Sequence, residues 1–249
     1  MARIVLTQPL PRVQDLTRSL ARRGHEVLAL PFTRIEPRPL ADLGDRLRGF
    51  QWVIAVSPAA VDALAEALGG AWPEPGPRLG LIGPGSLTSL RAGVLSTLSE
   101  DKLLHRDLPP YDARSLIDLP ELADPSGQSM LVVRGEGGRE DWIELLRTRG
   151  ARVETMALYD RLPAEPGRAE RERLATWLQH HTSVFCMFTQ TASIGSLCAL
   201  PEARGLAGPG SAGVALAIHE RIAEEAHRAG FSKVRLIEPG ESAIAAAIE

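Results

Sequence analysis

A turn rich in glycine and arginine is the segment of this sequence best suited to binding an anion. Arg134-Gly-Glu-Gly-Gly-Arg139 follows the apolar run Met130–Val133 and holds three glycines between two arginines. Glycine lets the backbone turn sharply, and a strand-to-helix turn presents N–H groups that attract negative charge. We therefore predict an anion-binding turn; the alternative is a tight turn whose arginines are solvated or paired with Glu136, Glu140 or Asp141.

The same turn does not have the pattern of a nucleotide-binding loop. A GxGxxG fingerprint would need glycine where Glu140 stands, and the GK[ST] of a P-loop is absent. The sequence therefore gives no support for NAD or ATP as a ligand.

Other polar residues also follow apolar segments. Thr7 ends the first of these, and Ser57 and Thr189 each follow a longer one, where they could cap a helix or bind a ligand. Gly83-Pro-Gly-Ser86 is a second glycine-rich turn, in which Ser86 is placed to cap the next helix, and capping alone explains it. His219 could be a base, but a cap or surface role is favoured because no GxSxG serine or nearby cysteine accompanies it.

Tyr159 is one of only two tyrosines and follows an apolar segment. A protonated phenol can donate a hydrogen bond or a proton to a leaving hydroxyl group. A packing role at an interface between lobes is equally compatible with its position. We predict no metal site, because His180-His181 has no second ligand pair and HExxH is absent.

These residues lie on a strand–helix–glycine–strand pattern that occurs twice. Ile4–Leu6, a helix over Pro11–Arg23, Gly24 and Val27–Leu30 are matched by Met130–Val133, a helix over Arg139–Arg149, Gly150 and Val153–Leu158. An offset of 126 (150 − 24) sets Leu16 on Trp142, Leu20 on Leu146 and Val27 on Val153 without a gap. A shared βαβ design explains this register.

Further strand and helix patterns follow each copy, ending in a strand over Lys233–Leu236. Strands that alternate with helices predict an α/β fold with parallel sheets covered on both faces. Phe32–Pro37 and Tyr159–Pro163 fall outside the pattern and are candidate crossings between two lobes.

Composition sets limits on the class of protein. The 249 residues are 44% apolar and 24% charged, as expected of a globular chain with two hydrophobic cores. The net charge of −3 argues against a basic surface that binds nucleic acid. Apolar runs are too short to span a membrane or to form a secretion signal, so we expect a cytoplasmic protein. Cys186 and Cys198 are expected to be buried small hydrophobic residues.

An ordered set of segments resembles the uroporphyrinogen-III synthase family over essentially the whole chain. The matching segments are Val5–Pro9, Ser57–Val61, Ile82-Gly83 with Ser86 nearby, Tyr111–Pro120, Leu131–Arg139, Ala157–Arg161 and Phe188-Thr189. Three positions depart from the family pattern: Gln8 replaces a usual arginine, Ser86 with Leu87 replaces a usual Thr-Ala pair, and His219 replaces a small hydroxyl residue.

The resemblance implies two flavodoxin-like or Rossmann-like parallel-sheet lobes joined by a two-stranded antiparallel connection. Residues 1–36 with 163–249 would form the first lobe and residues 37–162 the second. The expected protein is a monomer without cofactor, metal, nucleic-acid or membrane partners. Its substrate would be hydroxymethylbilane, a linear tetrapyrrole with eight carboxylates, held largely by backbone amides in a cleft.

The implied reaction is that of a hydro-lyase, a carbon–oxygen lyase of tetrapyrrole and haem biosynthesis. The hydroxymethyl carbon loses water, and the resulting cation closes the ring through a spiro intermediate that inverts ring D. Tyr159 would assist departure of the hydroxyl group. The implied substrate-binding residues are Thr7, Ser57, Gly83, Ser86, Arg134, Gly135, Gly138, Arg139, Thr189 and His219. The alternative is a two-lobed cytoplasmic anion-binding or sensor protein without catalysis. A glycosyl or nucleotide transferase would need an acidic residue that recognises the nucleotide and a phosphate-binding loop, and the sequence has neither pattern.

Overall fold

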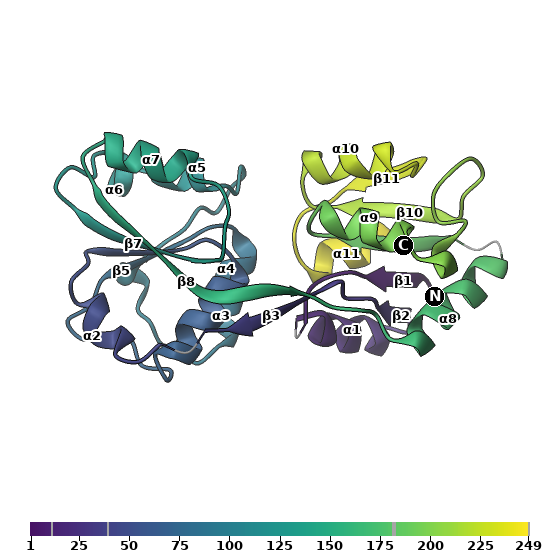
Figure 1. Cartoon of the computed structure of the whole chain (residues 1–249), viewed down its shortest axis with the longest axis horizontal. Helices are drawn as coiled ribbons and strands as arrows, with labels where there is room; N and C mark the ends of the chain where they lie inside the picture. Colours follow the sequence, from purple (N-terminus) through teal and green to yellow (C-terminus); the bar gives the residue numbers. More distant parts are fainter. Residues whose placement is uncertain (11, 39, 181–182, 249) are drawn as a thin grey trace. The chain divides into compact units, whose positions relative to one another are not determined.

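The computed structural model describes residues 1–10, 12–38, 40–180 and 183–248, so that Pro11 and His181 of the patterns above lie outside the described residues. Its contacts divide the chain into two compact units. Unit 1 comprises Met1–Ile35 and Leu162–Glu249, and unit 2 comprises Glu36–Arg161. Each unit contains a mainly parallel sheet flanked by helices, which confirms the predicted α/β class (Figure 1).

Unit 1 holds a sheet of five strands in the order β11-β10-β9-β1-β2, and every neighbouring pair is parallel. Apolar residues of α1 and α11 pack on one face, and those of α8, α9 and α10 pack on the other (Figure 1). The elements are β1 (Arg3–Leu6), α1 (Arg12–Arg22), β2 (Glu26–Ala29), α8 (Arg168–Gln179), β9 (Val184–Phe188), α9 (Ala192–Cys198), the short 3-10 helix η2 (Pro201–Ala203), β10 (Gly213–Ala217), α10 (Glu220–Arg228), β11 (Lys233–Leu236) and α11 (Glu241–Ile248).

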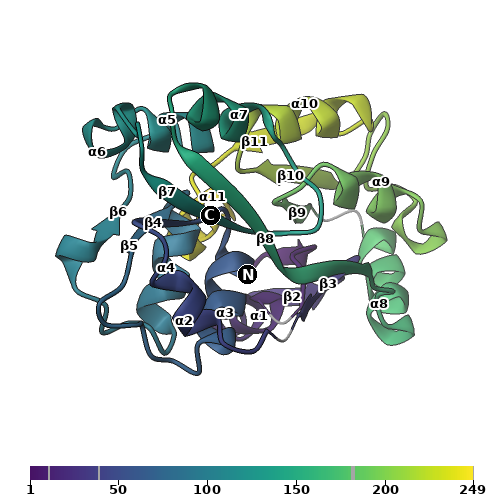
Figure 2. The same ribbon diagram turned by 60° about the vertical axis from the view of Figure 1, so that its left-hand side comes forward.

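The second sheet has the order β3-β8-β7-β4-β5-β6. Figures 1 and 2 show α5 and α7 over one face of this sheet and α3 and α4 over the other. The elements are β3 (Thr33–Pro37), α2 (Leu43–Leu47), β4 (Trp52–Ala55), α3 (Pro58–Ala67), β5 (Arg78–Leu81), α4 (Pro84–Ala92), η1 (Glu100–Lys102), β6 (Leu103–Leu104), α5 (Ala113–Ile117), α6 (Pro120–Ala123), β7 (Ser129–Gly135), α7 (Asp141–Thr148) and β8 (Arg152–Pro163).

The boundary between the units falls within both β3 and β8, which are neighbours in this sheet. Backbone hydrogen bonds run from Arg38 N to Leu158 O at 2.8 Å and from Ala164 N to Phe32 O at 3.0 Å. Residue numbers rise on one side of these pairs as they fall on the other, so the two segments run antiparallel. The expected break before Tyr159 is wrong, because β8 is one strand of 12 residues.

The structure confirms the repeated βαβ pattern and its offset. Ile4 pairs with Val27 in unit 1, and Met130 pairs with Val153 in unit 2, which is the same pairing moved by 126 positions. Gly24 and Gly150 follow the two helices with φ angles of 84° and 91°, a conformation that glycine adopts without strain. The glycine thus turns the chain from helix to strand in the same way in both copies.

Two features of unit 1 differ from expectation or were not predicted. Cys186 is buried, as predicted, but Cys198 is exposed, because it lies on an outward position at the end of α9. Helix α11, which was not predicted, packs its buried Ile244 and Ile248 into the same apolar cluster as Val13 of α1. No helix in the described part of the chain is both long enough and apolar enough to span a bilayer.

Candidate functional site

A cavity of about 310 Å³ lies where the parallel strands of unit 2 end. Val56 and Ile82 border it just after β4 and β5, Gly135 borders it at the end of β7, and Arg161 borders it near the end of β8. Ligands of open α/β sheets bind beyond the carboxyl ends of the strands. Because all of its lining residues belong to unit 2, this cavity is a candidate site contained within one unit.

The predicted glycine-rich turn forms one wall of the cavity. Gly137 and Gly138 have φ angles of 70° and 117°, which allow the chain to fold back between β7 and α7. A Cβ atom at Gly138 would lie 3.6 Å from Nη2 of Arg134, so the turn packs directly on that guanidinium group. The structure therefore brings together Arg134, Gly135, Gly138 and Arg139, as the sequence indicated.

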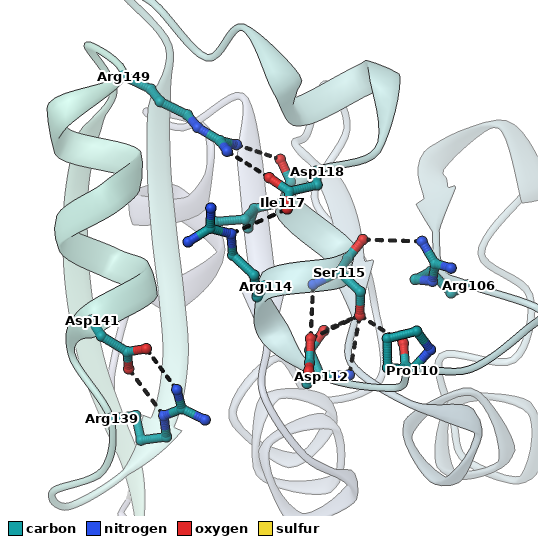
Figure 3. Close-up of polar contacts among 10 residues, drawn as sticks. All are labelled: Arg106, Pro110, Asp112, Arg114, Ser115, Ile117, Asp118, Arg139, Asp141 and Arg149. Carbon is teal, nitrogen blue, oxygen red and sulfur yellow. Dashed lines mark hydrogen bonds and ion pairs between the residues drawn. The ribbon is translucent and has the colours of Figure 1, made fainter.

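Both arginines of the turn have carboxylate partners in the structure. Arg134 Nη1 donates to Glu140 Oε1 at 2.7 Å, and its side chain is only 11% exposed. Arg139 donates to both oxygens of Asp141, from Nε at 3.0 Å and from Nη2 at 2.6 Å (Figure 3). The hydrogen bond from Arg139 lowers the pKa of Asp141. The alternative of pairing with local acidic residues is confirmed, and anion binding stays a prediction.

The opposite wall comes from α5, whose first turn supplies Asp112 and Arg114 to the cavity. Asp112 accepts a hydrogen bond from Ser115 N at 2.8 Å and so caps the helix. Asp118, at the end of α5, accepts hydrogen bonds from Arg114 and Arg149 (Figure 3). The bond from Arg149 is the main cause of a lowered pKa at Asp118. These contacts anchor α5, and with it the cavity wall, to α7.

Tyr159 is fully buried and is not among the residues that line the cavity. Its hydroxyl oxygen lies 3.0 Å from Ser57 Oγ and accepts a hydrogen bond from Arg161 Nη2 at 3.2 Å. The ring packs so closely on β7 that a Cβ atom at Gly135 would lie 2.6 Å from Cε2 of Tyr159. Of its two hydrogen-bond partners, Arg161 lines the cavity and Ser57 is not among the lining residues, so the phenol contacts the cavity lining through Arg161.

The sequence indicated helix capping for both Ser57 and Ser86, and the structure shows it for Ser57 only. Ser57 is the N-cap of α3, where its Oγ accepts from Ala60 N at 3.2 Å. Ser86 is not a cap, because Pro84 begins α4 two residues earlier and Gly83 occupies the N-cap position with a φ of 78°. Ser86 is buried within the first turn and donates to Ile82 O at 2.7 Å.

The remaining predicted residues lie at the carboxyl ends of adjacent strands in unit 1. Thr7 is buried and donates to Met187 O at 2.7 Å, so its hydroxyl group is used inside the unit. His219 caps α10 by accepting from Arg221 N at 3.1 Å, which confirms the favoured cap role. Thr189 is not a cap; Thr191 holds that position at α9. The predicted residues therefore form one group in each unit.

Two cavity arginines were missed from the sequence. Arg161 lies two positions after Tyr159 on the same strand, and alternation along a strand places such a pair on one face. Arg114 lies two positions after the capping residue Asp112, in the first turn of α5, which borders the cavity. The cavity lining thus includes four arginines, Arg114, Arg134, Arg139 and Arg161, against the two aspartates Asp112 and Asp141.

Known proteins of one family are similar to this chain. Two relatives named uroporphyrinogen-III synthase, from Salmonella typhimurium and from Escherichia coli, are 33% and 31% identical to it over 166 residues. Each alignment covers 64% of this chain, and the chain spans 64% of the length of each of these curated relatives.

Solved structures show a shared fold at lower identity. A mutant uroporphyrinogen III synthase from Thermus thermophilus is 16% identical with a TM-score of 0.54, covering 99% of this chain and 97% of that one. The uroporphyrinogen-III synthetase of Helicobacter pylori is 14% identical with a TM-score of 0.54, covering 100% of both chains. The family model described as uroporphyrinogen-III synthase HemD matches residues 14–244. The resemblance seen in the sequence is thereby confirmed: the chain belongs to the uroporphyrinogen-III synthase family.

Proposed function

We propose that this protein acts as a uroporphyrinogen-III synthase. It would cyclise hydroxymethylbilane with inversion of ring D and loss of water, as a hydro-lyase of tetrapyrrole and haem biosynthesis. Family membership supports the reaction. The structural observation that carries the proposal is the cavity at the strand ends of unit 2, which four arginines and a glycine-rich turn border.

The chemistry of the cavity suits carboxylates. Guanidinium groups bind carboxylates through paired hydrogen bonds, and the backbone N–H groups of a glycine turn add further donors. At about 310 Å³ the cavity is at the small end of the range for ligand pockets, so we propose that it receives acidic side chains of the tetrapyrrole rather than the whole molecule. Carboxylates of the substrate would replace Asp141 at Arg139 and Glu140 at Arg134.

The two units, Met1–Ile35 with Leu162–Glu249 and Glu36–Arg161, would be the two lobes of the enzyme, for which the expected bounds are 1–36 with 163–249 and 37–162. Numbered within each unit, the parallel strands have the order 2-1-3-4-5 in unit 1 and 3-2-1-4-5 in unit 2, which supports lobes of the flavodoxin and Rossmann types. The antiparallel β3 and β8 would be the two-stranded connection. A monomer that works in the cytoplasm without a cofactor stays a prediction.

Hydroxyl departure would need a proton, and we propose that Tyr159 supplies it. The proposed substrate contacts are those named from the sequence, in unit 2 Ser57, Gly83, Ser86, Arg134, Gly135, Gly138 and Arg139, and in unit 1 Thr7, Thr189 and His219. Because hydroxymethylbilane also closes spontaneously without inversion, the main task of the protein would be to hold the two ends of the substrate in one geometry.

An anion-binding or sensor protein without catalysis is the second candidate. The burial of Tyr159 favours it, because no phenol hydroxyl borders the cavity directly. Such a protein would use the same arginines without any bond being made or broken.

The test is to incubate freshly generated hydroxymethylbilane with the protein and to separate the ring isomers. Isomer III in excess of a protein-free control supports the synthase. Isomer I alone, formed at the spontaneous rate, contradicts it. In that case saturable binding of added polycarboxylate to the wild type, measured by calorimetry, would support the binding protein instead.

A further inference from the structure

The hydroxyl group of Tyr159 takes part in two hydrogen bonds whose direction can be worked out. Arg161 Nη2 lies 3.2 Å from the phenol oxygen, and Ser57 Oγ lies 3.0 Å from it. A guanidinium group carries donors only, so the phenol oxygen must accept from Arg161. The proton of the phenol is left to be placed.

That proton points to Ser57. Tyr159 is 0% exposed, and a buried O–H group without an acceptor is unfavourable. Among the described residues, Ser57 Oγ is the one acceptor within hydrogen-bond distance of this hydroxyl group. Tyr159 therefore donates to Ser57.

Ser57 is then left with a proton of its own to donate. Its Oγ accepts from the phenol at 3.0 Å and from Ala60 N at 3.2 Å, which uses both acceptor sites of the oxygen. No acceptor for the Ser57 hydroxyl proton is found in the described part of the chain. Unlike Tyr159, Ser57 is only half-buried; it is not itself among the residues that line the cavity, but it directly follows Val56, which is.

Arg161 is suited to stabilise negative charge at the other end. The other three arginines of the cavity are bonded to carboxylates, Arg114 to Asp118, Arg134 to Glu140 and Arg139 to Asp141. Arg161 has no carboxylate partner within the described ranges, and its guanidinium carbon lies 5.7 Å from the centroid of the Tyr159 ring. Its charge is therefore available to the phenol oxygen.

We propose that Arg161, Tyr159 and Ser57 form a directed proton relay, in which Ser57 and not Tyr159 is the catalytic residue that meets the substrate. The proposal rests on the proposed synthase function. As the carbon–oxygen bond of the hydroxymethyl group breaks, the leaving oxygen takes the Ser57 proton, Ser57 takes the Tyr159 proton, and a phenolate forms beside Arg161. Water and a substrate cation result, and the proton that the cation loses after ring closure returns to the phenolate.

The direction of the relay can be tested without any turnover. In a Tyr111→Phe background, Tyr159 is the single tyrosine, so the infrared C–O stretch of isotope-labelled tyrosine reports on it alone. That frequency differs between a phenol that donates a hydrogen bond and one that only accepts. We expect a donating phenol in this background and in Ser57→Thr, and loss of the donating signature in Ser57→Ala. A phenol that only accepts while Ser57 is present would overturn the relay.

Turnover tests the catalytic part. We expect Ser57→Ala and Tyr159→Phe each to lower kcat about tenfold or more, and the double variant to be no slower than the worse single variant, because the residues act as one unit. Ser57→Thr should keep kcat, whereas Ser57→Asp should lose it, since a carboxylate can cap α3 and accept from Tyr159 but has no proton to donate. Arg161→Gln should lower kcat as well.

Thr148→Ala, on the exposed side of α7, is the matched control for loss of a hydroxyl group and should leave kcat unchanged. Thermal unfolding of each variant checks that it is folded. If Ser57→Ala is unfolded, Ser57→Asp, which keeps the cap of α3, still tests the relay. Normal kcat in folded Ser57→Ala or Ser57→Asp, or additive losses in the double variant, would overturn the relay and leave the proposed synthase function standing. A wild-type protein that forms no isomer III would overturn the proposed function and the catalytic role together, while the infrared result would still decide the direction of the hydrogen bonds.

Discussion

Gly135 and Tyr159 are register partners on β7 and β8, and the space for a side chain at Gly135 is occupied by the tyrosine ring. A Cβ atom built on Gly135 would lie 2.6 Å from Cε2 and 2.8 Å from Cζ of Tyr159. The pairing shifts at this point, because Arg134 faces Ala157 while Gly135 faces Tyr159, which leaves Leu158 as an extra residue on β8. Such bulges redirect side chains, and this one directs a phenol under the glycine-rich turn that follows β7.

Gly135→Ala should destabilise unit 2 and move Tyr159. Contacts below 3 Å with a ring that is buried on every side cannot be relieved by a small rotation, so we expect a loss of about 1–3 kcal/mol in the free energy of unfolding. Urea unfolding measures it. Gly195→Ala is the control, since Gly195 lies in α9 with no atom within 4 Å of its Cβ position, and it should be neutral or stabilising by up to about 1 kcal/mol. Equal stability of Gly135→Ala and wild type would show that the ring is loosely packed.

Tyr159→Phe should leave the protein folded and lower turnover. The ring contacts remain, while Ser57 and Arg161 lose the hydroxyl group to which both are bonded. A positioned acid contributes about tenfold or more, so kcat for isomer III should fall by at least that factor while the circular dichroism spectrum is unchanged. Tyr111→Phe, which removes a hydroxyl group bonded to the backbone oxygen of Asp107, is the matched control. Unchanged kcat in Tyr159→Phe would remove the phenol from the mechanism.

Asp141→Asn should strengthen binding of anions to the cavity. Asp141 is ionised at neutral pH, and the hydrogen bond from Arg139 lowers its pKa further, so a bound carboxylate must replace a charged group at the same guanidinium. Removing this competing charge should lower the KM or Kd for a polycarboxylate by less than about tenfold, since the pair is exposed. Calorimetric titration with the polycarboxylate measures the effect. Asp45→Asn, which removes a carboxylate from an exposed pair with Arg48, is the control and should bind the polycarboxylate as the wild type does. Weaker binding by Asp141→Asn would contradict the proposal that Arg139 binds carboxylates.

Acid should remove the stabilisation that Asp118 supplies. Hydrogen bonds from Arg149 and Arg114 lower its pKa below the ordinary 3.8, so the folded protein favours the carboxylate. This contribution is present above the ordinary pKa and is lost as pH falls through the lowered one. The difference in unfolding free energy between wild type and Asp118→Asn should therefore be largest at neutral pH and shrink in acid, as urea unfolding at several pH values would show. A gap between wild type and Asp118→Asn that stays constant from neutral to acid pH would rule out this linkage.

Local pattern was sufficient to predict the repeated βαβ unit. The spacing of Leu16 and Leu20, or of Trp142 and Leu146, defines the apolar side of a helix, and Gly24 or Gly150 marks its end. These patterns depend on neighbours within a few residues, so they can be recognised without knowledge of the rest of the chain. Helix α11 was not predicted, although Ile244 and Ile248 have helical spacing; what they pack against, Val13 of α1, lies more than 200 positions earlier in the chain.

The sequence by itself determined the α/β class, the glycine-rich turn between Arg134 and Arg139, and the family pattern. The tertiary structure decided which carboxylates those arginines meet, placed Arg161 against Tyr159, and buried the phenol beneath Gly135. Strand and helix patterns are local, whereas a hydrogen bond between Ser57 and Tyr159 joins residues 102 positions apart. Such a contact depends on the order and register of strands that pair across the sheet, and these are settled only when the whole unit packs.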